Sequence, residues 1–437
     1  MFLVALISIF LQSQVVATTN ANTQKQTPPI VHPTIGQTLK TKELQVTFVD
    51  RKSCYSGTPK NYIDTDIRSP KSVNIHPGQS KYYVNSLEDS KTVVYNIQTG
   101  EKLKVISHKL NEQHKDLWAP ESGFFKFNYK RSDQNNFTGK PVEGAFSHNG
   151  RYFWVPYYRR SYDLNAQDPS AMAVIDTERD SIIRIFETGP LPKMVAVSAD
   201  QKKLAVSHWG NNTVGIMDIS SSNPDDWRYV AKVIVDKELQ LNFSRTEKVD
   251  RDKNSGYSLR GTVFTPDGKY LFVGCMGGGG GIAVIDAVNN RYLGRAIGTK
   301  PSLRHLIIKN GYIYASINAS GYVERIPLET FISSVQTLNG QSCKLVTVSG
   351  WTSCKVPAGA RTIEITPDGK YIFAACNFSS SLAVVNAETM KLMGTISADS
   401  YPVGLDVSKD GRYVLTTSQG RENGGGNSVN IFEIKYL

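Results

Sequence analysis

A repeated pattern of short hydrophobic runs and polar turns extends along most of the chain. Arg260–Gly298, Arg361–Ser397 and Lys193–Val235 align with one another, and weaker copies begin near Lys71 and Glu143. Each copy predicts a strand, a tight Pro-Asp-Gly-like turn, a second strand, a polar loop and two further strands. The runs are rich in β-branched and aromatic residues on both faces, as expected for sheets that are covered on both sides.

The turns between the first and second strands set the size of the repeating unit. They fall at seven positions: Gly78, Asn149, Asp200, Asp267, Asn310, Asp368 and Asp410. The two shortest spacings, Asp267 to Asn310 and Asp368 to Asp410, are 43 and 42 residues. A unit of this length is typical of a four-stranded propeller blade, so we predict an all-β, seven-bladed β-propeller.

The two ends of the repeat region predict how the ring closes. The last repeat has only three strands, Val403–Val407, Arg412–Thr417 and Ser428–Ile434. A spare strand, Glu43–Val49, precedes the first repeat. Pairing this strand with the last repeat would complete the seventh blade and remove an open sheet edge.

The N-terminal segment predicts export. An apolar run, Phe2–Leu11, is followed by polar residues and small residues at Ala17 and Ala21, the pattern of a signal peptide. We therefore expect a signal peptide over 1–21, a polar leader over 22–42 and one propeller domain over 43–437. The expected location is extracytoplasmic, either periplasmic or secreted, without a transmembrane segment.

The charge balance favours acidic partners. Lys and Arg number 50 against 39 Asp and Glu, a net charge of +11, which suits an anionic small molecule, a glycan or an acidic protein surface. Nucleic acid is a further possible partner, and we expect a monomer. The composition excludes collagen, coiled coils and polytopic membrane proteins.

Several repeat segments resemble a known family. Lys269-Tyr-Leu-Phe-Val, Lys370–Asn377, Thr213–Asp218 and Ala283–Asp286 are similar to YVTN-type β-propeller repeats. The resemblance implies an exported, microbial propeller that serves as a binding or surface module. It also implies a relationship to lactonase-type propellers, without specifying a reaction.

Basic residues recur where the innermost strand of each repeat begins. These aligned positions are Lys71, Lys193, Arg260, Arg304 and Arg361, whereas Glu143 or Val142 and Val403 occupy the other two repeats. Because innermost strands surround the central axis, we expect their side chains to line the mouth of the channel and to bind an anion there. The alternative is that they pair with acidic residues such as Glu143 or Asp399.

Other candidate residues fall at the end of the second strand or beside the basic position. Tyr157, Arg159, His208 and Trp209 are expected at the same mouth as ligand-binding residues, together with His305. Two alternatives to pure binding follow. One is a lactonase-like hydrolase acting on a lactone or phosphosugar, with His208 or His305 as catalytic base. The other is a binder of single-stranded nucleic acid, with Trp209 and Tyr157 as stacking platforms.

Insertions indicate which face of the disc carries function. Extra residues near 107–140, 236–259 and 333–355 are expected between the fourth strand of one repeat and the first of the next, and a shorter insertion lies at 158–170. All four would then lie on one face, which we expect to hold the site.

Cysteines and cofactor motifs complete the sequence picture. Cys343 and Cys354 flank an apparent hairpin in one insertion and are expected to form a disulfide, whereas the pairing of Cys54, Cys275 and Cys376 stays open. No metal-ligand spacing and no cofactor motif is recognised, so we expect neither a metal nor a cofactor.

Overall fold

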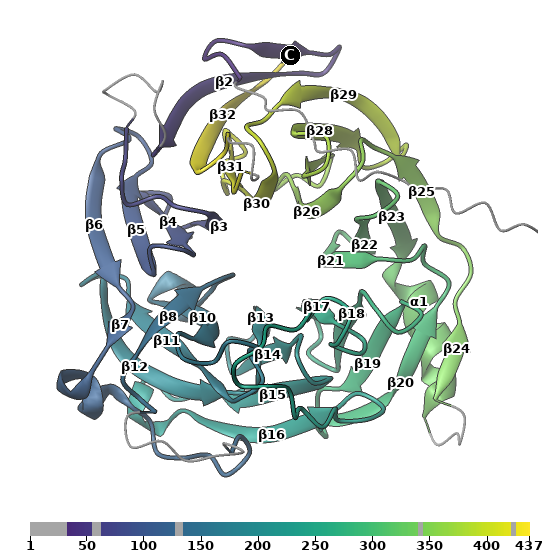
Figure 1. Cartoon of the computed structure of the whole chain (residues 1–437). Coiled ribbons are helices and arrows are strands. Elements are labelled where there is room, and N and C mark those ends of the chain that lie inside the picture. Colours follow the sequence, from purple (N-terminus) through teal and green to yellow (C-terminus); the bar gives the residue numbers. More distant parts are fainter. Residues whose placement is uncertain (1–32, 55–62, 127–133, 340–343, 421–424) are drawn as a thin grey trace, which may run out of the picture.

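The computed structural model describes residues 33–54, 63–126, 134–339, 344–420 and 425–437. Seven separate sheets surround a central axis, and Figure 1 looks along this axis. The predicted seven-bladed, all-β propeller is confirmed. The expected signal peptide, 1–21, lies outside the described residues. No helix within the described ranges is long and apolar enough to span a bilayer.

Blades 1 to 3 follow one another along the first half of the chain, and in each the strands run antiparallel from the axis outward. Blade 1 contains β3 (Pro70–Ile75), β4 (Lys81–Ser86), β5 (Lys91–Asn96) and β6 (Lys102–Ser107). Blade 2 contains β9 (Ala145–Ser147), β10 (Tyr152–Arg160), β11 (Ser170–Asp176) and β12 (Ser181–Thr188), with β7 (Lys109–Leu110) and β8 (Phe137–Pro141) added beside β10. Blade 3 contains β13 (Pro192–Val197), β14 (Lys203–His208), β15 (Thr213–Asp218) and β16 (Arg228–Ile234).

Blades 4 to 6 repeat the same order. Blade 4 contains β17 (Leu259–Phe264), β18 (Tyr270–Cys275), β19 (Ile282–Asp286) and β20 (Arg291–Ile297), with β24 (Leu345–Thr347) parallel to its outer edge. Blade 5 contains β21 (Leu303–Lys309), β22 (Tyr312–Ile317), β23 (Tyr322–Pro327) and β25 (Thr352–Lys355). Blade 6 contains β26 (Ala360–Ile365), β27 (Tyr371–Cys376), β28 (Ser381–Asn386) and β29 (Lys391–Ser397).

Blade 7 joins the two ends of the chain. Its inner strands are β30 (Pro402–Val407), β31 (Tyr413–Ser418) and β32 (Ser428–Tyr436), and its fourth strand is β2 (Leu44–Ser53). β2 pairs antiparallel with β32, from Leu44 opposite Tyr436 to Ser53 opposite Ser428, as the spare N-terminal strand predicted. A further short strand, β1 (Thr38–Lys40), pairs with β2, so part of the stretch predicted as a leader belongs to this blade. Figure 1 shows the purple β2 beside the yellow β32.

Helical elements are few and short. The described residues form one α-helix, α1 (Leu328–Val335), and the 3₁₀ helices η2 (Glu112–Leu117), η3 (His148–Gly150), η4 (Pro224–Asp226) and η5 (Gln336–Leu338). The core consists of clusters between neighbouring blades. One example contains Phe272 from blade 4, Leu306 from blade 5 and Phe331 from α1, each nearly inaccessible to water. Burying large apolar side chains between sheets supplies most of the stability of such a ring.

One of the predicted insertions is placed differently by the structure. Residues 333–355 do not connect a fourth strand to a first strand, because α1 follows β23 and β25 is itself the fourth strand of blade 5. The apparent hairpin around Cys343 and Cys354 is also wrong, since β24 pairs with blade 4 and β25 pairs with blade 5. An edge strand can pair with a neighbouring blade as easily as with its sequence neighbour, and turn signals do not distinguish the two.

The structure describes four of the five cysteines. Cys343 lies outside the described residues, and Cys354 is a buried free thiol in β25. The other described cysteines, Cys54, Cys275 and Cys376, are free thiols as well.

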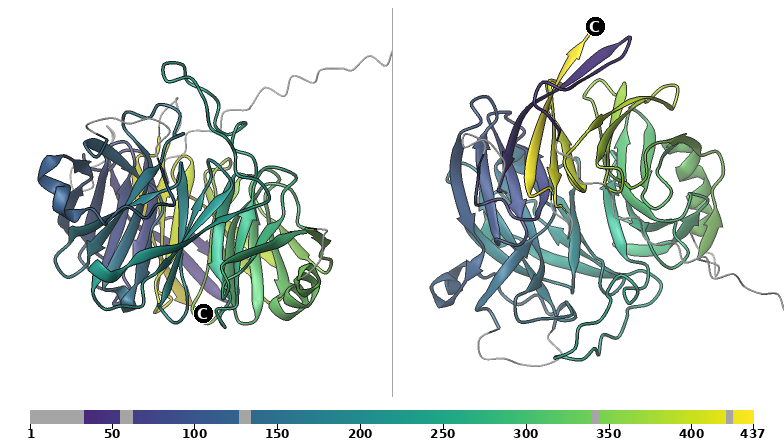
Figure 2. Two further views of the ribbon diagram at one scale, coloured as in Figure 1. Left: turned by 90° about the horizontal axis from the view of Figure 1, so that it is seen from below. Right: turned by 45° about the horizontal axis from the view of Figure 1, so that its top comes forward.

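The remaining insertions lie as predicted. Residues 236–258 connect β16 to β17, residues 108–144 connect blade 1 to blade 2, and residues 161–169 connect β10 to β11. In an up-and-down propeller these two kinds of connection lie on the same face. Figure 2 (left) shows loops that rise above one face of the disc.

Candidate functional site

Five basic residues at the starts of innermost strands form the candidate site. They are Lys71 of β3, Lys193 of β13, Arg260 of β17, Arg304 of β21 and Arg361 of β26, and we call them the cation ring. All five were predicted from the aligned repeats. The structure brings them close enough to repel one another: the pKa of Lys71, Lys193, Arg304 and Arg361 is lowered in each case by burial and then by the charge of other ring members, Arg260 among them.

A β-bulge at each position accounts for the shared orientation. The pairing of inner and second strands shifts register between Pro70 and Ser72, a step that contains Lys71. Equivalent shifts occur across Lys193, Arg304 and the Arg260 and Arg361 positions. A bulge inserts one extra residue into a strand and re-aims its side chain. Five bulged residues in equivalent places therefore carry their charges into one space.

The electrostatics of the cation ring are unfavourable in the free protein. Burial and, next in size, the positive charge of Arg260 lower the pKa of Arg361 to about 10. The pKa values of Lys71, Lys193 and Arg304 lie well below their usual ranges, first because of burial and then because of repulsion by other ring cations. Like charges that share a desolvated space disfavour the charged form. A negative charge placed among these cations would reduce their mutual repulsion and so stabilise the folded protein.

Only one carboxylate among the described residues forms an ion pair with the cation ring. Glu143 of blade 2 accepts a hydrogen bond from Nη2 of Arg260 in blade 4 at 2.8 Å, so the pair reaches across blade 3. The alternative of structural pairing thus holds for this one arginine. For Lys71, Lys193, Arg304 and Arg361, the part of the chain that the structure describes supplies no acidic ion-pair partner.

The other contacts of the ring are neutral. Nη1 of Arg304 donates to the Asn318 side-chain oxygen at 3.2 Å. The Lys193 ammonium lies over the rings of Tyr158 and Trp209, 4.3 and 5.5 Å from their centroids, which are cation–π contacts. Three guanidinium nitrogens, Nη1 of Arg260, Nε of Arg304 and Nε of Arg361, are buried without a hydrogen-bond partner in the described structure. Leaving a buried N–H unpaired is costly. Arg184, Arg251 and Arg295 also have such an Nε, but only the three nitrogens of Arg260, Arg304 and Arg361 belong to one ring of interacting charges.

A cavity of about 380 Å³ continues along the axis from the ring. Residues from all seven innermost strands line it, and many directly follow the ring cations, such as Ser72, Met194, His305 and Thr362. Farther along the same strands, Glu364 and Asp406 also face this cavity. Burial and the neighbouring Glu364 carboxylate raise the pKa of Asp406 to about 8. Glu143, which pairs with Arg260, also lines this cavity, whereas Glu364 and Asp406 lie farther along the strands than the ring cations.

The β10–β11 loop and the 236–258 insertion, which lie on the same face of the disc, are joined by hydrogen bonds and an ion pair. Asn165 and Gln167, in the β10–β11 loop, hydrogen-bond the backbone of the 236–258 insertion, and Arg245 pairs with Asp168. Arg251 donates to the carbonyls of Asn165, Ala166 and Gly210. The next residue, Asp252, is exposed and acts electrostatically on Lys193, Arg304 and Arg361, partly offsetting their repulsion. Sequence patterns did not identify Asp252, because its position depends on contacts between two loops far apart in the chain.

The remaining predicted residues lie in different surroundings. His208 is completely buried: the Gly189 N–H donates to Nε2 at 3.0 Å, and Nδ1 contacts the Thr213 hydroxyl at 2.8 Å. Since that hydroxyl donates to Asn211, Nδ1 must carry the proton, and burial lowers the pKa of His208 to about 3. Both ring nitrogens are therefore committed to the protein itself.

Tyr157 and Arg159 lie outside the cation ring, whereas Trp209 is at its edge. The hydroxyl of Tyr157 hydrogen-bonds to Nδ1 of His108 inside blade 2, and the side chain is fully buried. Arg159 donates to the carbonyl of Asp163 in the β10–β11 loop. Trp209 is buried and offers its ring to Lys193. None of these aromatic side chains presents a free face for stacking.

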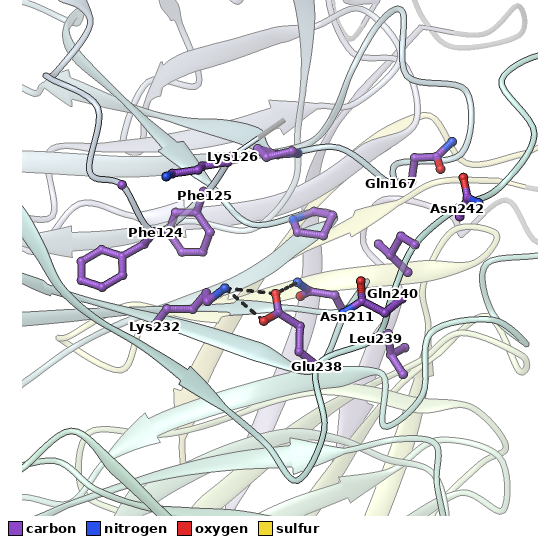
Figure 3. A pocket seen from close by; sticks show the side chains of 14 residues that line it. Phe124, Phe125, Lys126, Gln167, Asn211, Lys232, Glu238, Leu239, Gln240 and Asn242 are labelled. Carbon is purple, nitrogen blue, oxygen red and sulfur yellow. Dashed lines mark hydrogen bonds and ion pairs between the residues drawn. The ribbon is translucent and has the colours of Figure 1, made fainter. Parts of the chain in front are cut away.

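A second cavity, of about 700 Å³, opens beside the 236–242 segment. Figure 3 shows it between Phe124 and Phe125 on one side and Glu238 and Leu239 on the other. Glu238 pairs with Lys232 at 3.0 Å within it. None of the five ring cations lines this cavity, so the two spaces are separate sites.

Comparisons with known proteins agree with the observed fold. The chain is a seven-bladed β-propeller. It is similar to a chain of Kuenenia stuttgartiensis hydrazine synthase, with a TM-score of 0.58, 13% identity and coverage of 86% of this chain and 98% of that one. The β-propeller domain of Myceliophteria thermophila Cps50 (Swd1) gives a TM-score of 0.56 at 8% identity, covering 92% and 100% of the two chains. At these identities the similarity concerns fold alone.

Sequence similarity extends over a smaller part of this propeller. Antigen Lp49 of Leptospira interrogans (serogroup Icterohaemorrhagiae, serovar copenhageni) is 24% identical over 203 residues, or 42% of this chain. That alignment spans 39% of the Leptospira protein, so the chain matches about two fifths of the length of this curated relative. No family model matches the chain.

Proposed function

We propose that this propeller is a binding protein whose cation ring recognises an anionic ligand or an acidic group of a partner. The observation that carries the proposal is the set of buried guanidinium nitrogens without partners on Arg260, Arg304 and Arg361. Arg260 and Arg361 are only 2% and 3% exposed, so their guanidinium groups are shielded from bulk solvent. An oxyanion would supply acceptors and neutralise the repulsion at the same time.

The biological setting proposed for this activity is extracytoplasmic. The apolar run Phe2–Leu11 supports export, and the repeats similar to the YVTN type support a microbial surface or periplasmic module. Mass spectrometry of the protein recovered from its own organism tests export. Cleavage after Ala17 or Ala21 agrees with the proposal, whereas an intact N-terminus contradicts it.

A thermal-shift experiment tests anion binding. The full chain is titrated with sodium sulfate in a low-chloride buffer, and sodium perchlorate at equal ionic strength controls for general salt effects. Specific binding to the folded state raises the Tm with saturation. Arg361→Gln should abolish the saturable shift. Arg412, which is exposed and directly precedes β31 in blade 7, serves for the matched control Arg412→Gln. Equal shifts in all three proteins would contradict the proposal.

A hydrolase is the second candidate, and the placement of His305 favours it over other enzymes. His305 lines the axial cavity and experiences the charges of Arg260 and Glu143. Its Nδ1 contacts the Ile363 carbonyl at 3.0 Å, and burial lowers its pKa to about 4, so the imidazole is neutral at pH 7. In a hydrolase, a neutral imidazole can act as the general base while neighbouring arginines stabilise the oxyanion that forms. Hydrolysis of lactones or phosphosugars that His305→Ala eliminates supports this candidate; turnover unchanged in His305→Ala rejects it. His208 cannot act in this way, because both of its nitrogens are occupied.

A further inference from the structure

The number and arrangement of charges in the cation ring restrict the kind of anion that fits. This reasoning rests on the proposed function. Among the described residues, one carboxylate, Glu143, forms an ion pair with the five basic side chains, through Arg260, and the exposed Asp252 offsets their repulsion only in part. A ligand with a single negative charge would leave most of the ring repulsion in place, because at least three cations would still lack a counter-charge.

The positions of the cations around the axis also matter. Arg260, Arg304 and Arg361 come from the consecutive blades 4, 5 and 6 and form an arc of guanidinium groups. Lys71 and Lys193 come from blades 1 and 3, on either side of blade 2, which carries Glu143. The ligand therefore meets forked donors on one side and ammonium groups on the other.

The unpartnered donors set a minimum number of acceptor atoms. Each of the three arginines presents a buried N–H without an acceptor, and these nitrogens belong to three different blades. A guanidinium edge commonly binds two oxygens of the same carboxylate or phosphate. One carboxylate has about four lone-pair sites, fewer than the donors of three arginines and two lysines require. Two or more oxyanion groups on one molecule would supply enough acceptors.

The burial of the ring argues against a polymer. Lys71, Arg260 and Arg361 are 7%, 2% and 3% exposed, and the joined insertions that carry Asp252 lie on the same face. Asp252 adds a negative charge near the ring, which would repel an extended polyanionic backbone lying across that face. A compact molecule can enter where a nucleic acid or glycosaminoglycan chain cannot lie.

We infer that the cation ring binds a small polyanion carrying at least two oxyanion groups, such as a tricarboxylate or a diphosphate. The arginine arc of blades 4 to 6 holds one oxyanion group, and Lys71 and Lys193 hold another. The aromatic rings of Tyr158 and Trp209 contact the Lys193 ammonium and restrict its position.

Isothermal titration calorimetry on the full chain tests this inference. Citrate and pyrophosphate are compared with sulfate and acetate at one ionic strength in a low-chloride buffer. The expected gain in affinity is about 10-fold or more for each added oxyanion group, since charge-assisted hydrogen bonds contribute on that scale. Heparin should not displace citrate.

Variants separate this inference from the function on which it rests. Arg304→Gln retains a side chain able to contact Asn318 and should lose citrate affinity by about 10-fold or more, whereas Arg412→Gln should not change it. If sulfate and citrate bind equally well and Arg304→Gln weakens both, anion binding stands and the polyanion inference is wrong. If heparin displaces citrate, a polymeric ligand replaces the small one. If no anion binds, or Arg304→Gln binds like Arg412→Gln, the proposed function also fails.

Discussion

Replacing Arg361 with methionine should stabilise the protein in the absence of an anion. The guanidinium is 3% exposed, has a buried Nε without a partner, and is repelled by Arg260. Methionine keeps much of the apolar side chain and removes the charge. Because the arginine has a net unfavourable environment in the folded state, the usual penalty for truncating a buried residue should be reversed in sign.

The magnitude follows from the pKa. An arginine with a usual value of 12.5 is lowered to about 10. One pKa unit corresponds to about 1.4 kcal/mol, so the charged form is destabilised by about 3 kcal/mol in the folded state. The sign is that of a base with a depressed folded pKa: the penalty is fully present below pH 10 and disappears as the pH rises through the unfolded value. It is therefore constant between pH 6 and 8.

Urea denaturation at pH 7 in a low-chloride buffer measures the effect. Arg361→Met should raise the free energy of unfolding by about 1 to 3 kcal/mol, the lower figure allowing for lost packing. Adding citrate at about 100 times its Kd should stabilise the wild type by about 2.7 kcal/mol and the variant much less. Arg412→Met, at an exposed position, should stay within about 0.5 kcal/mol of the wild type. A variant less stable than the wild type without citrate, together with equal gains from citrate, would refute the reasoning.

Three further predictions concern the rest of the channel and the ring closure. Glu143→Gln removes the partner of Arg260 and should lower the free energy of unfolding by about 3 kcal/mol in anion-free buffer while tightening citrate binding, measured by urea denaturation and calorimetry; weaker binding would contradict this. The pKa of Asp406 is raised to about 8, so the folded protein keeps a proton that the unfolded chain loses, and stability should fall between about pH 4 and 8. In urea denaturation across this pH range, the free energy of unfolding of Glu364→Gln should decline less steeply than that of the wild type. Equal slopes in the two proteins would argue against coupling of the two carboxyls. Deleting residues 1–53 removes β2 and exposes the β32 edge, so light scattering should detect aggregation; a monomer with unchanged Tm would show that closure is dispensable.

The amino-acid sequence alone determined the blade pattern, because that pattern is local. The Pro-Asp-Gly turns at Asp267 and Asp368 and the β-branched strands that flank them specify hairpins without reference to the rest of the chain. Closure by β2 was also predictable, since pairing the spare N-terminal strand with the three-stranded last blade completes that blade and covers its open edge. The cation ring followed from alignment, because equivalent positions in a cyclic repeat converge on one axis.

Only the tertiary structure decided which charges are satisfied and which loops lie together. Glu143 reaches Arg260 across an intervening blade, and Asp252 approaches the ring because two insertions bind each other. His208, a candidate base by its position, is kept neutral by burial, and Gly189 and Thr213 occupy both of its ring nitrogens. The β24 and β25 strands join different blades. These outcomes depend on desolvation and on contacts between distant segments, which exist only after the ring has closed and which no local pattern encodes.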